Sequence, residues 1–433
     1  MFLGMRGSND WVANQRPLNW RQQIMYLYPN GMMPLTALTA LMGTESVDDP
    51  RFNWWTYTFT TAQGAVTGVF TTPDLLNAYV TGGLAGQTLY VAISAADAAR
   101  IRIGHQILLR DASDWSVDVI GKVTNVTIGV IGTLAVKLLE DDDNSTMVPA
   151  NDLSNCDNYL IMGNVNPEGG VMPDPVALNP TPHYNYTQIF RTSLAITRTA
   201  RKTKLRTGDD YQKAKREALE MHGIEMELAF WWGVRTENVG DNGKPERTTM
   251  GLINFIRQNA AANCDDFTTN PAYAGTTWAT SGRIWLITML EQMFRYGGSE
   301  RLAVCGSGAL MGINEMVNAN AQYTIENVPN VYGMDVRKLV TPFGTINFKT
   351  HPLFSFDPTT RNMMVLFEPK DLKYRYIDDT TFYGESGKTV GEGNNSRRID
   401  GTEEEWLTEC GLEYHHAVKD SVLNGVGLDS VLP

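Results

Sequence analysis

Cysteine and histidine are scarce in this sequence, and their scarcity excludes several kinds of site. The 433 residues include four cysteines and six histidines. The cysteines lie far apart with no CxxC spacing, so the sequence indicates neither a disulfide framework nor a zinc site. We expect buried thiols in a reducing compartment. The four residues are Cys156, Cys264, Cys305 and Cys410.

Catalytic motifs are also missing. The sequence contains neither a GxSxG nor an HExxH pattern, and so few histidines give little from which to build general acid–base chemistry. Gly306-Ser-Gly-Ala could be mistaken for a phosphate loop, but it lacks the Lys-Ser/Thr of a P-loop, so we expect a strand-to-helix turn. These absences favour a protein that is not an enzyme and uses no cofactor or metal.

Long apolar runs and an excess of positive charge are absent as well. No apolar run approaches the ~20 residues of a membrane helix, and the apolar part of Met1–Asp10 is too short for a signal peptide. The net charge is −12 and the pI is about 5.1, whereas binding to nucleic acids or anionic membranes requires a basic surface. We therefore expect a soluble, unexported protein that is not a general binder of nucleic acid or membrane.

The most organised stretch of the chain runs from residue 186 to residue 232. Ser193–Arg198 interleaves apolar residues with hydroxyls, which predicts an extended strand. Thr207-Gly-Asp-Asp210 fits a capping box and precedes a proline-free segment, so we expect a helix over residues 209–232. The predicted core-facing side of this helix consists of Tyr211, Ala214, Ala218, Met221, Glu225, Leu228 and Trp232, which recur at helical spacing.

Residues 84–148 differ in character from the rest of the chain. They contain short, regularly spaced strand-like runs that glycines separate, so we predict a small inserted β-barrel or sandwich. Glu140-Asp-Asp-Asp143 could ligate calcium, but it lacks the glycine and the distal glutamate of an EF-hand, and we favour a solvated turn. Residues 151–182 are rich in glycine, proline and asparagine, which is typical of a long exposed loop.

The second half of the chain predicts a mixed α/β region followed by a long strand. Residues 282–296 are amphipathic and lead into a strand at Arg301–Cys305, a succession typical of α/β folds. Near the C-terminus, even-numbered positions from Trp406 to Val418 are predicted to share one face of a strand. Because neighbouring strand residues point to opposite faces, His415 and His416 are not expected to form one metal site, and a structural role is favoured.

Together these features resemble the major capsid proteins of tailed double-stranded DNA bacteriophages. The resemblance covers nearly the whole chain and rests on the order of four segments, which are residues 27–38, 47–55, 186–191 and 372–377. It implies an α+β fold in which a long spine helix lies on an elongated β-sheet. A mixed α/β axial domain and an extended loop, which carries the inserted small β domain, complete this implied fold.

The resemblance also implies a division into domains. The peripheral (P) domain holds the spine helix and the long sheet, and the axial (A) domain is the mixed α/β region. The predicted boundaries are 1–50 for an N-terminal arm, 51–59 for a P-domain strand, 60–185 for the extended loop (E-loop) with its insertion at 84–148, 186–246 for the P-domain with its spine helix at 209–232, 247–370 for the A-domain, and 371–433 for the return of the P-domain sheet and the C-terminus.

The function that this resemblance implies is structural. The protein would self-assemble in the host cytoplasm into an icosahedral-type shell of hexamers and pentamers, the virion capsid, around double-stranded DNA. Portal and scaffolding proteins and a cement or decoration protein are the implied partners. The alternative is the shell of a cellular encapsulin-like nanocompartment with the same fold, against which the β insertion and the length of 433 residues argue. A third hypothesis, a soluble enzyme, predicts a compact monomer or small oligomer.

Two sets of residues are predicted to make contacts between subunits. The arm and the loop are too polar and too rich in glycine and proline to fold alone, so their large aromatic side chains are expected to bury area only on assembly. These predicted anchors are Trp11, Trp20, Trp54 and Trp55.

The second set is a cationic stretch within residues 191–206, which contain six cations and no acid. It consists of Arg191, Arg198, Arg201, Lys202, Lys204 and Arg206. The stretch could face packaged DNA or the acidic surface of a neighbouring subunit. Because the chain as a whole is acidic and salt screens long-range attraction, the neighbour is favoured.

Overall fold

The computed structural model of the chain divides into two compact units. Unit 1 comprises residues 1–56 and 182–433, and unit 2 comprises residues 57–181. The residues that the structure describes are 34–39, 43–57, 62–113, 117–142, 153–169, 180–202, 210–319, 325–331, 334–386, 389–390, 397–398 and 400–432. Each unit has a hydrophobic core of its own.

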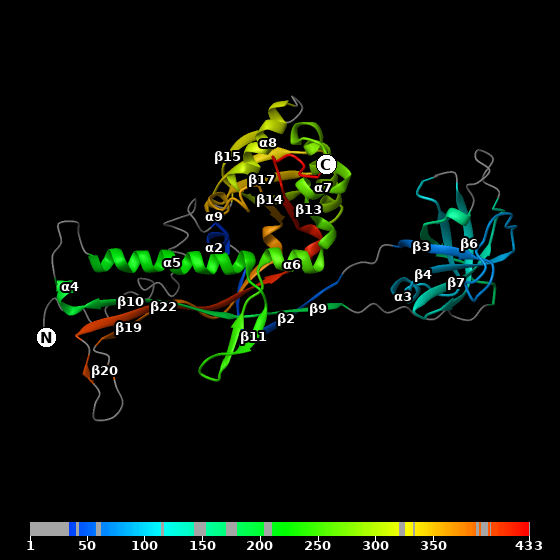
Figure 1. Ribbon diagram of the computed structural model, residues 1–433. Coiled ribbons are helices and arrows are strands. Elements are labelled where there is room, and N and C mark those ends of the chain that lie inside the picture. The colour runs from blue at the N-terminus through cyan, green and yellow to red at the C-terminus, as the bar shows by residue number, and fades with distance from the viewer. Residues whose placement is uncertain are drawn as a thin grey trace. The chain divides into compact units, whose positions relative to one another are not determined.

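The first part of unit 1 is a four-stranded sheet with a long helix along one face (Figure 1). The strand order is β1 (Thr44–Ser46), β19 (Leu372–Ser386), β22 (Gly401–Tyr414) and β10 (Gln188–Thr197). β22 pairs antiparallel with both β10 and β19. Helix α5 (Asp210–Trp232) runs along this sheet, so the predicted helix and its C-terminal end are confirmed. The class of the fold, α+β, is confirmed as well.

Strand β22 shows the predicted alternation of faces. Trp406, Thr408 and Cys410 are buried, whereas Glu405 and Glu409 lie on the other, partly exposed face. The strand nevertheless ends at Tyr414, earlier than predicted. It ends there because the backbone two residues later is left-handed, with φ of 52° at position 416, a conformation that a β-strand does not contain.

The buried face of α5 is not the predicted one. The helix buries Ala218, Leu219, His222, Met226, Glu227, Phe230 and Trp231. Of the predicted face only Ala218 is fully buried, whereas Met221 is 59% and Leu228 40% exposed. The pattern misled because two of the buried side chains, His222 and Glu227, are polar and hydrogen-bonded, so apolar periodicity does not trace the packing face.

His222 joins α5 to three strands of the sheet. Its Nε2 lies 2.7 Å from Thr408 Oγ1, and its Nδ1 lies 3.0 Å from Thr192 Oγ1. The Thr408 hydroxyl in turn donates to Thr380 Oγ1 over 2.9 Å. Burial lowers the pKa of His222 to about 4, so the ring is neutral at pH 7. A continuous line of hydrogen bonds therefore crosses β10, α5, β22 and β19.

The second part of unit 1 is a seven-stranded mixed sheet with helices packed against it (Figure 1). Its order is β13 (Cys264–Asp266), β23 (Ser421–Asn424), β18 (Met364–Phe367), β14 (Glu300–Cys305), β17 (Thr345–Thr350), β16 (Met334–Val340) and β15 (Ile325–Val331). The helices are α6 (Leu252–Asn259), α7 (Arg283–Phe294), α8 (Ser307–Ala319) and α9 (Pro352–Phe356). Gly306 forms the predicted turn between β14 and α8.

The C-terminal strand β23 belongs to this seven-stranded sheet, whereas β19 and β22, which lie in the range predicted for the return of the P-domain sheet and the C-terminus, belong to the long sheet. β23 pairs with β18 and β13, so Val422 lies opposite both Val365 and Cys264. Val422 and Leu423 are buried in two different cores, one on each face of the sheet. A short strand that is apolar on both faces has no alternation to reveal its sheet, so only the tertiary pairing places it.

Shorter elements complete unit 1. The short helices are α2 (Pro34–Thr39) and α4 (Arg198–Lys202). Two-stranded ribbons pair β2 (Arg51–Thr56) with β9 (Thr181–Tyr186), β11 (Thr236–Val239) with β12 (Pro245–Thr248), and β20 (Thr389–Val390) with β21 (Arg397–Arg398). The P-domain strand predicted at residues 51–59 corresponds to β2, which ends at Thr56.

Unit 2 is a closed β-barrel. In barrel order its strands are β3 (Gln63–Phe70), β4 (Thr88–Ser94), β7 (Ile131–Leu138), β6 (Asp118–Thr127), β5 (His105–Arg110) and β8 (Asn158–Asn164), and a short helix α3 (Ala95–Ala98) follows β4. The predicted bounds 84–148 are therefore wrong, because β3 and β8 lie outside them and close the barrel. Both of these strands contain glycine, which weakens the strand pattern in the sequence.

Within the acidic run predicted as a solvated turn, Glu140 and Asp142 are hydrogen-bonded inside unit 2, Asp141 is exposed, and residue 143 lies outside the described residues. Glu140 accepts from the N–H of Ile120 over 2.6 Å. Asp142 is 3% exposed and accepts from the Tyr79 hydroxyl and from the N–H of Leu153. These two carboxylates accept from buried or partly buried donors within unit 2, so their role is structural.

All four cysteines lie among the described residues and are free thiols. Cys156, Cys305 and Cys410 are buried free thiols, and Cys264 is half-buried. Burial raises the pKa of Cys156 and of Cys305 to about 12. Among the described residues, no helix is long and apolar enough to cross a membrane, and no group of three or more His, Cys, Asp or Glu side chains could hold a metal ion.

Candidate assembly surfaces

Helix α2 is fixed to α5 by one buried carboxylate, that of Glu227. Its Oε2 accepts from the N–H and the hydroxyl of Thr36 over 2.6 and 2.7 Å, and its Oε1 accepts from the N–H of Leu35 over 2.9 Å. These N–H groups belong to the first turn of α2, so the carboxylate caps that helix. Oε1 also lies 2.8 Å from both the Trp231 indole nitrogen and His351 Nε2.

The Glu227 carboxylate is held in its ionised form. Burial raises its pKa, but hydrogen bonds from His351 and Thr36 outweigh the burial and keep the pKa below the usual value of glutamate. Removing the charge would leave several buried donors without an acceptor. One signal for this site is an acid inside an apolar stretch of helix, at Met226-Glu227-Leu228, and sequence reasoning missed it.

The structure separates the four predicted tryptophan anchors. Trp54 is 4% exposed within the subunit and packs beside Phe52 and Phe255, so the prediction that it buries area only on assembly is wrong. The cause is the pairing of β2 with β9, which turns alternate side chains of β2 into the core of unit 1. Trp55 points the other way and is 63% exposed. Trp11 and Trp20 lie outside the described residues.

Part of the predicted N-terminal arm packs within the subunit. Leu35 of α2 is 1% exposed and belongs to the same core as Trp54, so residues 34–39 pack within the subunit. The part of the arm over residues 1–33 lies outside the described residues. A contact with a neighbouring copy therefore remains a prediction for residues 1–33 and for Trp55, and no longer for α2 or Trp54.

The first two cations of the basic stretch are paired within the subunit. Arg191 donates to both oxygens of Glu405 over 2.9 and 2.7 Å. Arg198 forms an ion pair with Asp400 at 2.7 Å, and this hydrogen bond raises the pKa of the arginine. Both acids lie on or just before β22, directly across from β10, so the pairing follows from the strand register.

The other cations of the stretch lie around α4. Arg201 lies over the Tyr211 ring, with 4.8 Å between its guanidinium carbon and the ring centroid, and also bonds Thr402. Lys202 is exposed at the end of α4. Lys204 and Arg206 lie outside the described residues. The structure thus neutralises part of the stretch and leaves Lys202 available for a partner.

The hairpin β11–β12 has a rigid root at the end of α5. The N–H of Gly251 donates to the Gly233 carbonyl over 2.8 Å, and a Cβ at Gly233 would lie 2.4 Å from a carbonyl oxygen, so only glycine permits this approach. The buried Asn185 side chain donates to the Leu412 carbonyl and accepts from the N–H of Met250, each over 2.8 Å. The hairpin is therefore anchored to β22 and to the start of α6.

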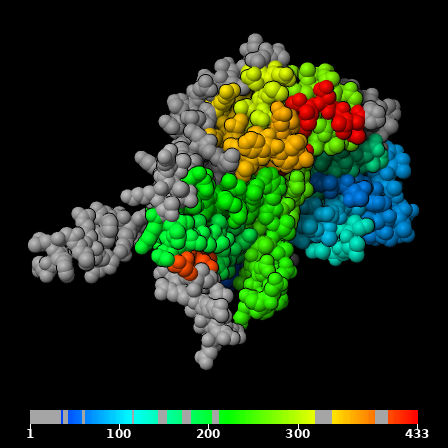
Figure 2. Space-filling model, turned by 60° about the vertical axis from the view of Figure 1, so that its left-hand side comes forward, coloured from blue at the N-terminus to red at the C-terminus, as the bar shows by residue number. Residues whose placement is uncertain are grey.

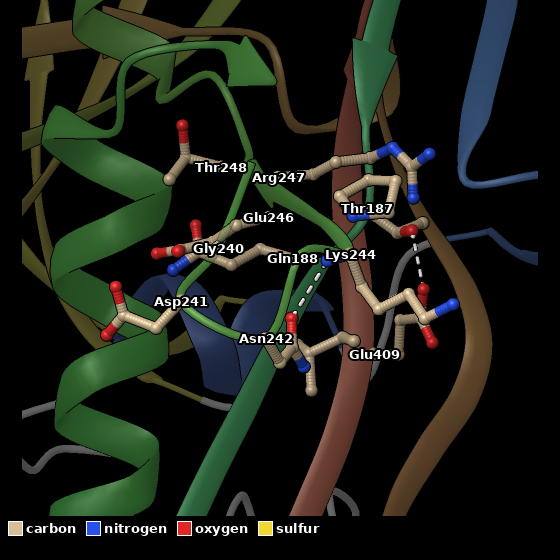
Figure 3. Close-up of a pocket in the computed structure, with 12 residues that line it drawn as sticks. Thr187, Gln188, Gly240, Asp241, Asn242, Lys244, Glu246, Arg247, Thr248 and Glu409 are labelled. Atoms are coloured by element: carbon tan, nitrogen blue, oxygen red, sulfur yellow. Dashed lines mark hydrogen bonds between the residues drawn. The ribbon is translucent and has the colours of Figure 1, made fainter. Parts of the chain in front are cut away.

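A cleft of about 390 Å³ lies between this hairpin and the sheet (Figure 3). On the sheet side the Thr187 hydroxyl donates to Glu409 over 3.0 Å, and at the hairpin tip the N–H of Lys244 donates to Asn242 Oδ1 over 3.0 Å. The lining carries both signs of charge, and Val239 beside the tip is 79% exposed. The cleft therefore presents polar groups and charges of both signs at the surface of unit 1.

His415 has a structural partner. It bonds Glu413 at 2.5 Å, and Arg375 bonds the other oxygen of the same carboxylate at 2.5 Å. Burial raises the pKa of Glu413, but the hydrogen bonds from His415 and Arg375 outweigh it and hold the pKa below its usual value. The structural role that the sequence favoured for His415 agrees with this geometry.

Known proteins match this chain over most of its length. The family model described as SU10 major capsid protein matches residues 7–426. The curated major capsid protein of Pseudomonas phage PaMx41 is 24% identical over 403 residues, which cover 91% of this chain and 87% of that protein.

Two solved structures also align with this chain, at low sequence identity and a low TM-score. The structure titled Microbacterium phage Oxtober96 has a TM-score of 0.37 and 9% identity, and covers 90% of this chain and 97% of that chain. The holo-SrpI encapsulin complex from Synechococcus elongatus PCC 7942 has a TM-score of 0.35 and 10% identity, and covers 57% of this chain and 76% of that chain.

The sequence match decides the family. It spans nearly the whole chain and names a phage capsid protein, so the predicted resemblance is confirmed and the encapsulin-like alternative is not favoured. The chain belongs to the SU10 major capsid protein family, and its function is that of a shell-forming capsid protein of a phage.

Proposed function

We propose that this chain builds a closed, icosahedral-type shell of hexamers and pentamers around the double-stranded DNA of a tailed phage. The observation that carries the proposal is the family match over residues 7–426. A capsid protein acts as many identical copies, so its function lies in repeated contacts between copies. We accordingly propose a structural role without enzymatic activity.

Each region of the chain has a proposed place in this shell protein. The four-stranded sheet with α5 is the P-domain, and the seven-stranded sheet, including β23, is the A-domain. Unit 2 is the domain that the E-loop carries, and β2 and β9 are the strands that precede and follow it in the chain. Trp55, exposed on β2, is the proposed anchor of this loop on a neighbouring copy.

The basic stretch is proposed to contact an acidic surface of a neighbouring copy. The internal pairs of Arg191 with Glu405 and of Arg198 with Asp400 support this choice, because they show that the stretch binds carboxylates of this protein's own sequence. Packaged DNA, which the shell would enclose, is the second proposed partner of the stretch. Portal and scaffolding proteins and a decoration protein complete the proposed partners, with assembly in the host cytoplasm.

Deletion of residues 1–30 tests the assembly proposal. The truncated chain retains α2 and its contacts with Glu227, so we expect a folded subunit by circular dichroism. Residues 1–30 carry the predicted anchors Trp11 and Trp20, so analytical ultracentrifugation and electron microscopy should show no closed particles, whereas the full chain forms them. A full chain that stays monomeric under every assembly condition would contradict the proposed shell. Closed particles from the truncated chain would show that residues 1–30 are not needed for assembly.

A further inference from the structure

Strand β10 forms one edge of the four-stranded sheet, and no strand of the described part of the subunit pairs with its outer side. The opposite edge strand, β1, has only three residues, whereas β10 has ten. Neither a proline nor a bulge interrupts β10, and its register with β22 is continuous. Proteins usually blunt such a long edge, because its unpaired N–H and C=O groups can pair with another extended chain. The edge of β10 is therefore suited to receive a strand from outside the subunit.

Two hydrogen bonds show which residues of β10 face outward. The N–H of Arg198 donates to the Asp400 carbonyl in continuation of the β10–β22 register, so the even-numbered residues bond to β22. The N–H of Thr187, an odd-numbered residue, donates instead to the Pro50 carbonyl, outside this ladder. The backbone groups of the odd-numbered residues of β10 therefore point outward, and none of them bonds to a described residue. These residues are Ile189, Arg191, Ser193, Ala195 and Thr197.

A second copy of β10 fits this edge in the antiparallel direction. When the two strands are centred on Ser193, each outward-facing residue lies opposite another outward-facing residue. Arg191 then lies opposite Ala195, so no two charged side chains are opposed. Ile189, which is 57% exposed, lies opposite Thr197 and gains a contact with its methyl group. A pair centred on Arg191 would instead place two arginines opposite each other, which is destabilising.

The charges beside the two ends of β10 are complementary as well. The strand leads into α4, where Lys202 is exposed, and it starts at the cleft beside the hairpin β11–β12. This hairpin projects from the surface of unit 1 (Figure 1 and Figure 2). The charged residues that line the cleft are Asp241, Glu246, Glu409, Lys244 and Arg247.

The cleft has an excess of negative charge, because Arg247 is already paired with Glu237 at 3.1 Å. In an antiparallel pair, the end of one strand lies beside the start of the other. The cationic α4 of each copy would therefore lie near the cleft of the other copy, where opposite charges meet.

We propose that β10 pairs antiparallel with β10 of a second copy across a two-fold axis at Ser193, so that two four-stranded sheets become one continuous sheet. The same surface serves both copies, so the contact joins two copies and no more. This proposal rests on the proposed shell function and names one of its contacts. A shell of hexamers and pentamers needs head-to-tail contacts within each ring and further contacts that join the rings. The β10 pair would supply a contact of the second kind.

Cross-linking at the two-fold axis tests the proposal. Ser193→Cys places an exposed thiol on each copy, ~5 Å from that of the second copy, so a short bismaleimide should convert subunits of assembled particles into covalent dimers. Ala195→Cys is the matched control, because it is exposed too but its two copies would lie ~14 Å apart at ~3.4 Å per residue. The wild-type chain, whose own thiols are buried or half-buried, gives the background.

The cross-linking experiment has clear contrary outcomes. Closed particles of Ser193→Cys without covalent dimers would overturn the proposal, and so would equal dimer yields from Ser193→Cys and Ala195→Cys. An adduct between Ser193→Cys and any other polypeptide in the particles would overturn it as well, since another strand would then occupy the edge. If the wild-type chain forms no particles, the proposed function fails instead.

A proline on the edge tests the energetic role of the pair. Ser193→Pro removes an outward N–H and keeps the bonds to β22, so the circular dichroism of the subunit should stay unchanged. The protein concentration needed for closed particles should rise at least about tenfold, because the central hydrogen bonds of the pair are lost. Ser193→Ala keeps the N–H and should assemble as the wild-type chain does. Normal assembly of Ser193→Pro, or an equal loss in Ser193→Ala, would contradict the proposal; if Ser193→Pro does not fold, the cross-linking decides.

Discussion

The contact between α5 and its sheet differs in chemistry from the barrel of unit 2. The barrel core is mainly apolar, with fully buried residues such as Leu89, Ile107 and Val136, although the Asp142 carboxylate is buried beside Tyr79. The helix contact buries apolar residues too, but His222 and Glu227 lie among them with complete hydrogen bonding. The barrel therefore gains its stability mainly from buried apolar surface area. The position of α5 also depends on the hydrogen bonds of His222 and Glu227 and on the charge of Glu227.

This difference affects how each region responds to change. An apolar core tolerates changes of pH, because it contains few groups that titrate. A buried neutral histidine and a buried carboxylate bind protons differently in the folded and unfolded states, so pH alters their contribution to stability. Unit 1 should thus be the more acid-sensitive part of the subunit, and four experiments test this contrast.

The largest effect is expected from Ala218→Pro in the middle of α5. Proline removes a hydrogen bond of the helix and clashes with the preceding turn, which costs about 3 kcal/mol or more. The measurement is the yield of soluble subunit together with its thermal unfolding. Ala218→Gly, which should cost only about 1 kcal/mol, is the control. A normal yield of stable Ala218→Pro protein would show that α5 does not need to be continuous.

Glu227→Gln should destabilise the subunit by about 3 kcal/mol, because the buried donors of α2 and His351 lose their charged acceptor. Urea denaturation of the unassembled subunit measures this change. Glu225→Gln, two residues earlier on an exposed side, should change stability by no more than about 0.5 kcal/mol. Equal effects of the two substitutions would mean that the carboxylate does not anchor α2.

Acid should weaken unit 1 through His222. Its pKa is 6.5 in the unfolded chain and about 4 in the fold, so the unfolded state binds the proton more readily. The stability from the neutral ring is complete above pH 6.5 and is lost as pH falls toward 4, by on the order of 3 kcal/mol.

Urea denaturation between pH 7 and pH 4 tests this acid effect. His222→Gln should reduce the loss of stability over this interval without abolishing it, because the pKa values of Glu227, His183 and His416 are also lowered. His105→Gln in the barrel is the control and should leave the pH dependence of unit 1 unchanged. An unchanged pH dependence in His222→Gln would contradict the assignment of this loss of stability to His222.

The smallest effect on unit 1 is expected from removal of the barrel. A short Gly/Ser linker in place of residues 63–164 should change the stability of unit 1 by about 0.5 kcal/mol or less, because unit 1 has its own core. Removal of residues 84–148 alone should instead cause aggregation, since it leaves β3 and β8 without their partners. Circular dichroism and light scattering measure both. Soluble protein after removal of residues 84–148, with none after removal of residues 63–164, would support the bounds predicted from the sequence over those of the barrel.

Local features could be predicted from the sequence. The bounds of α5, the alternation of β22 and the turn at Gly306 depend on residues within a few positions of one another. The strands within residues 84–148 could be predicted for the same reason. Of the candidate site, the exposure of Trp55 follows from alternation along β2, and the same alternation buries Trp54, which sequence reasoning did not separate.

The family and many of the helices and strands could be predicted without the structure, because periodicity, capping signals and the order of segments are properties of the linear chain. The buried side of α5, the pairing of β23 and the closure of the barrel could be established only from the three-dimensional structure. These depend on partners far away in the chain, such as Thr36, which lies 191 residues from Glu227. A buried polar residue is stable only with such a partner, so hydrophobicity along the chain cannot reveal it.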